Sequence, residues 1–367
     1  MTRARIWIRR LMLVLVGCLL ATAAVAGAFP GTRVSYVVRS GYFQAELLAR
    51  RVPLDEARAR PDLSPEIRAG LDIVDDVKAF GLEIGLARTG NYDTIALDFD
   101  RKMYNISATP ALSFEPVTWW FPVVGRVPYL GFFREEDADK AAARLSDEGY
   151  EVYRRRIGTY STLGWFRDPL LPGMVEDSSY DIARLVLHES AHATVWVPGS
   201  VSFNETFASF VGDEAAMRYM ESRFGADSDE LKKAREDQED IFLFRRLQHE
   251  LYNRLNAVYK DKSLTDEQKL VKKAEIMADF PSVVDAAPLH DRKFYSKAVR
   301  KGTWNNPRLM QFRTYNNGRE AFEALLRASG GDLLKFMYTV RDVAGEGKDP
   351  YAAVRKAAGA VAPEAAD

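Results

Sequence analysis

The sequence predicts an α+β protein that is mainly α-helical. From Asp181 onward, apolar residues recur at intervals of three and four positions along most of the chain, the periodicity of helices packed on a core. The section from Ile95 to Phe133 is instead rich in aromatic and β-branched residues, which favours strands and hairpins. The 367 residues, 47% of them hydrophobic, are enough for one sizeable core or two smaller ones.

Residues 1–29 are predicted to form a signal peptide or an N-terminal membrane anchor. Four arginines precede residues 11–29, which carry no charged side chain and are nearly long enough to cross a bilayer of about 30 Å. Ala24-Val-Ala26 fits a cleavage site, and Cys18, the only cysteine, ends a lipobox-like sequence. We therefore expect residues 30–367 to be exported to the bacterial cell envelope and to fold without an internal disulfide.

The section before Asp181 should combine helices with strands. Helical patterns lie near residues 54–88 and from Asp137 to Glu148, and Glu151–Gly158 has the pattern of a strand. The stretch 114–133 combines aromatic residues with two prolines, which is more typical of hairpins beside a cleft than of a regular sheet.

The next helix carries the pattern H-E-x-x-H. Ser178-Ser-Tyr-Asp181 predicts its start, and Pro198-Gly199 predicts its end. Residues four apart lie on one face of a helix, so His188 and His192 can bind one metal ion. The carboxylate of Glu189 can then reach an attacking water as a general base. The alternative is that both histidines belong to a buried polar core, which would require partners for two imidazoles and a carboxylate.

A third metal ligand is expected on the helix that follows. Glu205 is our choice, because the chain can turn at residues 198–199 and return antiparallel with this carboxylate in its opening turn. Ser202-x-x-Glu205 is also a capping box, in which Glu205 would bind only a backbone N–H. Glu214 is the reserve ligand, with Asp213 beside it. Either could instead be a solvated acid on the helix surface or support a ligating histidine.

Two charged helices should follow, from about Ser228 to Lys260 and from Thr265 to Ala278. Their mixed charges predict a solvated helical arm or lid over about residues 228–280, with His249 as a surface residue. A net charge of −1 gives no broad positive field, so we expect no nucleic-acid partner.

H-E-S-A-H together with N-E-T-F-A-S-F-V-G resembles the gluzincin metallopeptidases. Gly41-Tyr-Phe-Gln-Ala, the segments 122–133 and 160–169, and Asn305 to Asn316 extend the resemblance to a bacterial family of putative aminopeptidases, many of them envelope lipoproteins. The resemblance implies a zincin-like helical core and a peptide substrate. It also implies that His188, His192 and Glu205 bind Zn²⁺ and that Glu189 is the catalytic acid and base.

Hydrolysis of a peptide bond also needs a group that stabilises the oxyanion. Tyr315 is our choice for this catalytic residue, with three other polar side chains as alternatives: Tyr160, His290 and Arg313. Trp165 and Phe166 are expected to form a substrate wall or to close the core beside the metal helix.

The sequence therefore predicts zinc-dependent peptide-bond hydrolysis at the cell envelope, with aminopeptidase specificity as the form that the resemblance implies. Two other classes stay open. One is a non-catalytic envelope binding or assembly protein with a structural metal site, and the other is a metal-independent scaffold with a buried polar network.

Overall fold

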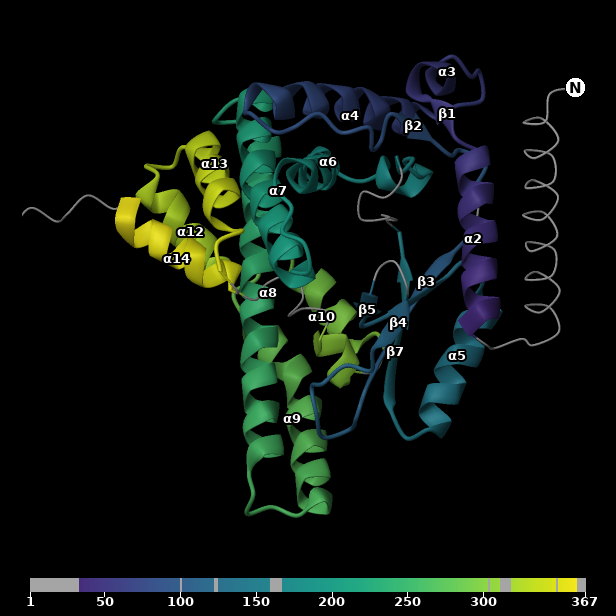
Figure 1. The fold of residues 1–367 in the computed structure, drawn as a ribbon, viewed down its shortest axis with the longest axis vertical. Helices are drawn as coiled ribbons and strands as arrows, with labels where there is room; N and C mark the ends of the chain where they lie inside the picture. The colour runs from purple at the N-terminus through teal and green to yellow at the C-terminus, as the bar shows by residue number, and fades with distance from the viewer. Residues whose placement is uncertain are drawn as a thin grey trace, which may run out of the picture.

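The computed structural model describes residues 33–99, 101–121, 125–158, 167–302, 304–310, 318–347 and 349–361. It confirms a mainly helical α+β fold with small antiparallel sheets (Figure 1). The predicted signal or anchor segment, including Cys18, lies outside the described residues. Across the described ranges, no helix combines the length and the apolar character needed to cross a membrane.

The first half of the chain alternates helices with short strands. The predicted helical region near 54–88 forms two helices, and the predicted helix after Asp137 and the strand at Glu151 are confirmed. The elements are α2 (Arg33–Ala49), β1 (Val52–Pro53), α3 (Leu54–Arg58), α4 (Pro65–Glu83), β2 (Thr94–Ile95), β3 (Met103–Thr109), β4 (Trp119–Phe121), β5 (Gly125–Val127), β6 (Leu130–Phe132), α5 (Glu135–Asp147) and β7 (Glu151–Ile157).

The second half of the chain is helical. It begins with a short 3-10 turn that leads into the helix with the two histidines. The elements are η1 (Pro172–Met174), α6 (Ser179–Thr194), α7 (Val201–Phe224), α8 (Asp229–Lys260), α9 (Asp266–Ala286), α10 (Arg292–Arg300), α12 (Arg319–Ala328), α13 (Leu333–Val343) and α14 (Pro350–Val361).

The three-stranded sheet has β3 in its centre, with β6 and β7 paired antiparallel on either side. Side chains alternate between the two faces of a strand. Tyr104 and Ile106 of β3 thus pack in the cluster that includes Ala138 and Leu145 of α5. Asn105 lies on the opposite face, which borders the cavity described below.

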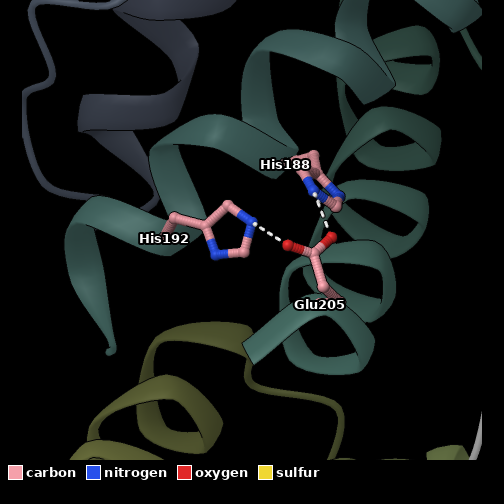
Figure 2. A group of neighbouring side chains, drawn as sticks. All are labelled: His188, His192 and Glu205. Atoms are coloured by element: carbon pink, nitrogen blue, oxygen red, sulfur yellow. Dashed lines mark ion pairs between the residues drawn. The ribbon is translucent and has the colours of Figure 1, made fainter. Parts of the chain in front are cut away.

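The largest core surrounds α6 and α7. These helices pack closely, and α4 and the C-terminal helices cover their other sides (Figure 1). The helices face each other at His188, His192 and Glu205 (Figure 2). Gly212 of α7 permits the approach, because a Cβ atom there would lie 3.2 Å from the Cβ of His188.

The two charged helices form an antiparallel pair, α8 and α9, that extends away from the main core (Figure 1). Ser228 and Thr265 are the N-caps, so both helices begin where the sequence predicts, but α9 continues through Pro281 to Ala286. Their facing sides form a core of their own, which includes Leu251 and Phe280. The pair is therefore a packed subdomain whose solvated faces carry the mixed charge.

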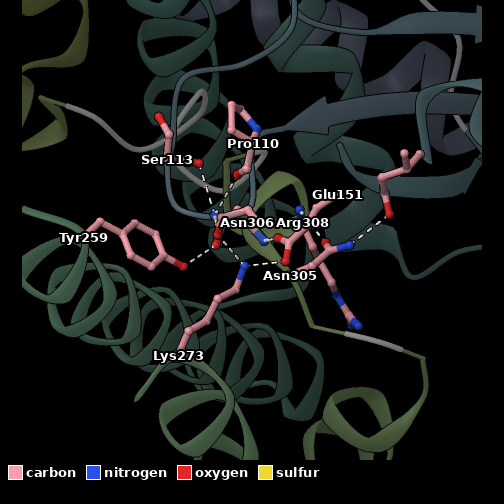
Figure 3. A network of polar contacts seen from close by, with 10 residues as sticks. Pro110, Ser113, Glu151, Tyr259, Lys273, Asn305, Asn306 and Arg308 are labelled. Atoms are coloured by element: carbon pink, nitrogen blue, oxygen red, sulfur yellow. Dashed lines mark hydrogen bonds and ion pairs between the residues drawn. The ribbon is translucent and has the colours of Figure 1, made fainter. Parts of the chain in front are cut away.

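A buried polar network joins this helical pair to the sheet (Figure 3). Asn306 is fully buried, and its side-chain amide donates to the carbonyls of Pro110, Ala111 and Ser113. Its side-chain oxygen accepts from the Tyr259 hydroxyl at 2.7 Å. Each of these groups thus has the partner that burial requires.

Lys273 of α9 takes part in the same network. Its ammonium group binds the Glu151 carboxylate at the start of β7 and donates to the carbonyl of Ala111 at 2.7 Å. Burial lowers the pKa of Lys273, although Glu151 opposes this shift. The contact holds the pair of α8 and α9 against the three-stranded sheet.

We expect Lys273→Met to lower the free energy of unfolding by about 2 kcal/mol, because it leaves the Glu151 carboxylate without its cationic partner. The matched control is Lys272→Met, since Lys272 is exposed on the same helix. Urea unfolding of both variants measures the difference. Equal stabilities would show that the network does not hold the helical pair.

Candidate functional site

Helix α6 begins where the sequence predicts. Ser178 is the N-cap, and its hydroxyl oxygen accepts from the backbone N–H of Asp181 at 3.2 Å. Ile182, Val186 and Leu187 are buried in the main core, so the helix is fixed along that side. The two histidines, one turn apart, lie on the side that faces the start of α7.

Asn204 fixes the turn between the two helices. Its side-chain oxygen accepts from the N–H of Val197 at 2.8 Å, and its amide donates to the carbonyl of the same residue at 2.9 Å. The next residue, Glu205, is therefore held in the first turns of α7. Ser200 is the N-cap of α7, so the alternative of a capping box that starts at Ser202 is wrong.

The structure brings His188, His192 and Glu205 together (Figure 2). The two carboxylate oxygens of Glu205 lie 3.7 Å from Nε2 of His188 and 3.6 Å from Nε2 of His192. Ligand atoms at 2.0–2.2 Å from a tetrahedral metal are roughly 3.4 Å apart, whereas hydrogen bonds are shorter than these distances. The spacing thus fits a metal held between the three side chains better than it fits direct hydrogen bonds.

The charges of two of the three side chains, His192 and Glu205, also suit a metal. Burial lowers the pKa of His192 to about 4, with a further contribution from His188. Burial alone would raise the pKa of Glu205, but the two histidines lower it below its ordinary value. Burial also lowers the pKa of His188, whereas Glu205 and Glu189 raise it, and the net shift is upward. A neutral imidazole and an ionised carboxylate are the forms that bind divalent ions.

Glu189 is 6% exposed and lines the same cavity as the triad. It lies outside the group of side chains that could hold the ion, as expected of a base that acts on an attacking water. The cavity has a volume of about 690 Å³ and extends from the triad along α6 to the sheet. It is large enough for a peptide fragment to reach the triad.

Tyr92 is a cavity residue that the sequence did not single out. Its backbone has a φ of 62°, the left-handed region that is uncommon for a residue other than glycine. Its N–H donates to the carbonyl of Asp168 at 2.8 Å, which holds it beside α6. Burial and the negative charges of Glu189 and Asp168 raise the pKa of the Tyr92 phenol, so it remains a hydrogen-bond donor at neutral pH.

Tyr129 lines the cavity from the hairpin side. Desolvation raises the pKa of its phenol, and the nearby Glu205 carboxylate raises it further. Tyr129 lies in the segment 122–133 that carries the resemblance, but the sequence assigned neither tyrosine a role, and both approach the triad through contacts distant in sequence. The sequence signals nearest to them are the predicted hairpins beside a cleft and the Asp168 segment.

The reserve ligands have other roles. Asp213 is buried and forms ion pairs with Arg319 and Arg245 at 2.8 and 3.3 Å. Glu214 is outside the triad, and burial raises the pKa of its carboxyl group. Two histidines also lie apart from the metal group: His249 stacks on Tyr252, and His290 binds Glu239.

Several predicted site residues fall outside the described residues, and their roles stay predictions: Tyr160, Trp165, Phe166, Arg313 and Tyr315. His290, the remaining alternative for oxyanion stabilisation, is not a wall residue of the cavity, within the part of the chain that the structure describes.

Comparison with known proteins supports the family that the motifs suggest. Residues 35–353 match the model of a family described as "Putative aminopeptidase". Searches of curated proteins and of solved structures gave no match. The matched segment contains α6, α7 and all three side chains of the triad. Since the match covers most of the 367 residues, the chain belongs to the putative aminopeptidase family.

Proposed function

We propose that this protein is a zinc-dependent peptidase that acts as an aminopeptidase at the bacterial cell envelope. The observation that carries the proposal is the triad of His188, His192 and Glu205 with Glu189 beside it on one cavity. Two imidazoles and one carboxylate are the ligand set of catalytic zinc sites that keep a position open. The family description supports a peptide as the substrate.

When bound, zinc would polarise the peptide carbonyl and make water acidic enough to attack near neutral pH. Glu189 accepts the proton from the attacking water and returns it to the leaving amine. Its position in the cavity wall limits access of bulk water, so the proton is kept at the reacting centre. Tyr92, which lines the cavity together with Glu189, joins Tyr315 as a candidate for stabilising the negative charge that develops on the carbonyl oxygen.

The location at the envelope rests on the sequence of residues 1–29, with their basic start and long uncharged stretch. Fractionation of cells that produce the full chain would test it. Recovery of the protein with the cytoplasmic fraction would contradict export.

The peptidase proposal is tested with purified full-length protein, zinc-loaded or treated with a chelator, and with two forms of each peptide. An aminopeptidase should cleave peptides with a free amino terminus and leave N-acetylated copies intact. Chelation should abolish cleavage, and added zinc should restore it. Equal cleavage of free and acetylated peptides would exclude aminopeptidase specificity, whereas bound zinc without cleavage would favour a structural metal site.

A further inference from the structure

Three arginines line the cavity that contains the metal triad: Arg155 of β7, Arg184 and Arg245. Arg184 lies on α6, and Arg245 reaches the cavity from α8. Both guanidinium groups meet at Asp213 of α7, which is 2% exposed and therefore closed to substrate. The two guanidinium groups thus form one wall of the cavity beside the proposed catalytic residues.

The charge at this wall is not balanced by Asp213. Its carboxylate forms ion pairs with three guanidinium groups: Arg319 at 2.8 Å, Arg245 at 3.3 Å and Arg184 at 3.8 Å. Arg319 also binds Glu323 and stacks on Phe210, so other groups share in holding it. Within the described residues, the ion pairs of Arg184 and Arg245 shorter than 4 Å are both made with Asp213.

Arg184 also has hydrogen-bonding capacity to spare. At 3.8 Å its contact with Asp213 is too long for a hydrogen bond. Its Nε atom is buried and has no hydrogen-bond partner within the described part of the chain. The Arg184 side chain is nevertheless 36% exposed, and an arginine fork is matched best by the two oxygens of a carboxylate. Two acidic residues, Asp177 and Asp181, line the same cavity. Burial and Asp181 raise the pKa of Asp177, whereas Arg184 lowers it. Within the described residues, neither acid forms an ion pair with Arg184.

The position of Arg184 relates this wall to the reaction. Arg184 and His188 are one helical turn apart on α6, about 6 Å along the helix axis. An extended peptide advances by roughly 3.3–3.6 Å per residue, so this rise corresponds to about two residues. For a peptide that runs along α6, a group bound by Arg184 would therefore lie about two residues from the bond at the metal.

We propose that Arg184 and Arg245 form a carboxylate-binding subsite, which selects peptides that carry a carboxylate about two residues from the bond to be cleaved. Asp213 holds the two guanidinium groups in place from beneath the cavity wall. The inference rests on the proposed peptidase function and specifies its substrate. The carboxylate can be the C-terminus of a short peptide or the side chain of an acidic residue.

Binding is measured by calorimetry in zinc-loaded, full-length Glu189→Gln protein, so that peptides remain intact. The first arm compares a neutral tetrapeptide with a free C-terminal carboxylate against its C-terminal amide. The second arm compares amidated tetrapeptides that have Glu or Gln at the third or fourth residue. We expect the carboxylate form to bind about tenfold to a hundredfold more tightly in at least one arm, and that arm identifies the source.

Arg184→Gln should remove most of this difference and leave the affinity for the neutral peptides unchanged. Arg184→Lys, which retains the charge but not the fork, should keep only part of it. The matched control is Arg155→Gln, because Arg155 also lines the cavity but belongs to β7. Loss of the preference in the Arg155 variant alone would overturn the assignment, as would equal binding of charged and neutral peptides or no binding of either.

The result is distinguishable from failure of the peptidase proposal. Wild-type protein is incubated with the same peptides, and the products are identified by mass spectrometry. A carboxylate preference in binding without cleavage would support the subsite and contradict the peptidase. Cleavage without any preference would support the peptidase and contradict the subsite.

Discussion

Glu189→Gln is expected to lower kcat by about a thousandfold while the protein keeps one bound zinc. Glutamine has nearly the shape of glutamate but cannot accept the proton of the attacking water. Glu189 lies outside the group of ligand side chains, so the substitution leaves both histidines and Glu205 in place. The effect should therefore fall on the chemical step, with little change in KM or in metal content.

The measurement combines steady-state kinetics with metal analysis of the dialysed protein. Glu214→Gln is the matched control, since it makes the same chemical change at a glutamate of α7 that is not part of the triad. We expect wild-type kcat and zinc content for that variant. A Glu189→Gln protein with undiminished kcat would rule out this residue as the base, and one that loses zinc would show that Glu189 is a ligand.

The sequence was sufficient to predict the triad because its geometry is local. The i, i+4 spacing fixes His188 against His192 on any regular helix, and the short turn at Pro198-Gly199 limits where Glu205 can lie. The capping box at Ser202 was the alternative that local pattern could not exclude. It is wrong because the chain already enters the helix at Ser200, whose carbonyl accepts from the backbone N–H of Asn204.

The rest of the cavity depends on contacts between segments that are far apart in the chain. Helix α2 was not predicted, and it joins the wall where the Tyr36 hydroxyl accepts from the N–H of Gly131. Tyr92 reaches α6 through a left-handed backbone held by Asp168, a conformation that no residue type at that position signals. Likewise, no periodicity places Arg184 and Arg245 at one buried carboxylate.

The helical pair shows a different limit of sequence reasoning. Abundant charge along α8 and α9 predicted a solvated arm, but a charged sequence can still bury one apolar stripe. Leu247, Leu251 and Leu255 form that stripe, and α9 and α10 cover it. Pro281 did not end α9 as the local rule suggests, because packing of Phe280 and Val284 holds the helix on both sides of it.

Replacement of Glu205 should have the second large effect, this time on the metal itself. Glu205→Gln removes the charged ligand and leaves two imidazoles, so we expect zinc affinity to fall by more than about a hundredfold, the upper range for loss of an outer-shell partner. Activity should be lost at limiting zinc and should return only in part when zinc is added in excess. The buried position of the carboxylate and its contact with both histidines are the physical reason.

The decisive comparison is again with Glu214→Gln, which makes the same change further along α7. Competition with a chromophoric chelator gives the zinc affinity of wild type and of both variants.

If Glu214→Gln lost zinc and Glu205→Gln kept it, the reserve ligand would be the true one and the triad would be wrong. If both variants and the wild type bound no zinc, Glu189 and the histidines would form a buried polar network, and the scaffold alternative would replace the peptidase. Loss in Glu205→Gln alone makes the triad a metal site, because a carboxylate that only balanced histidine charge would leave metal uptake unchanged.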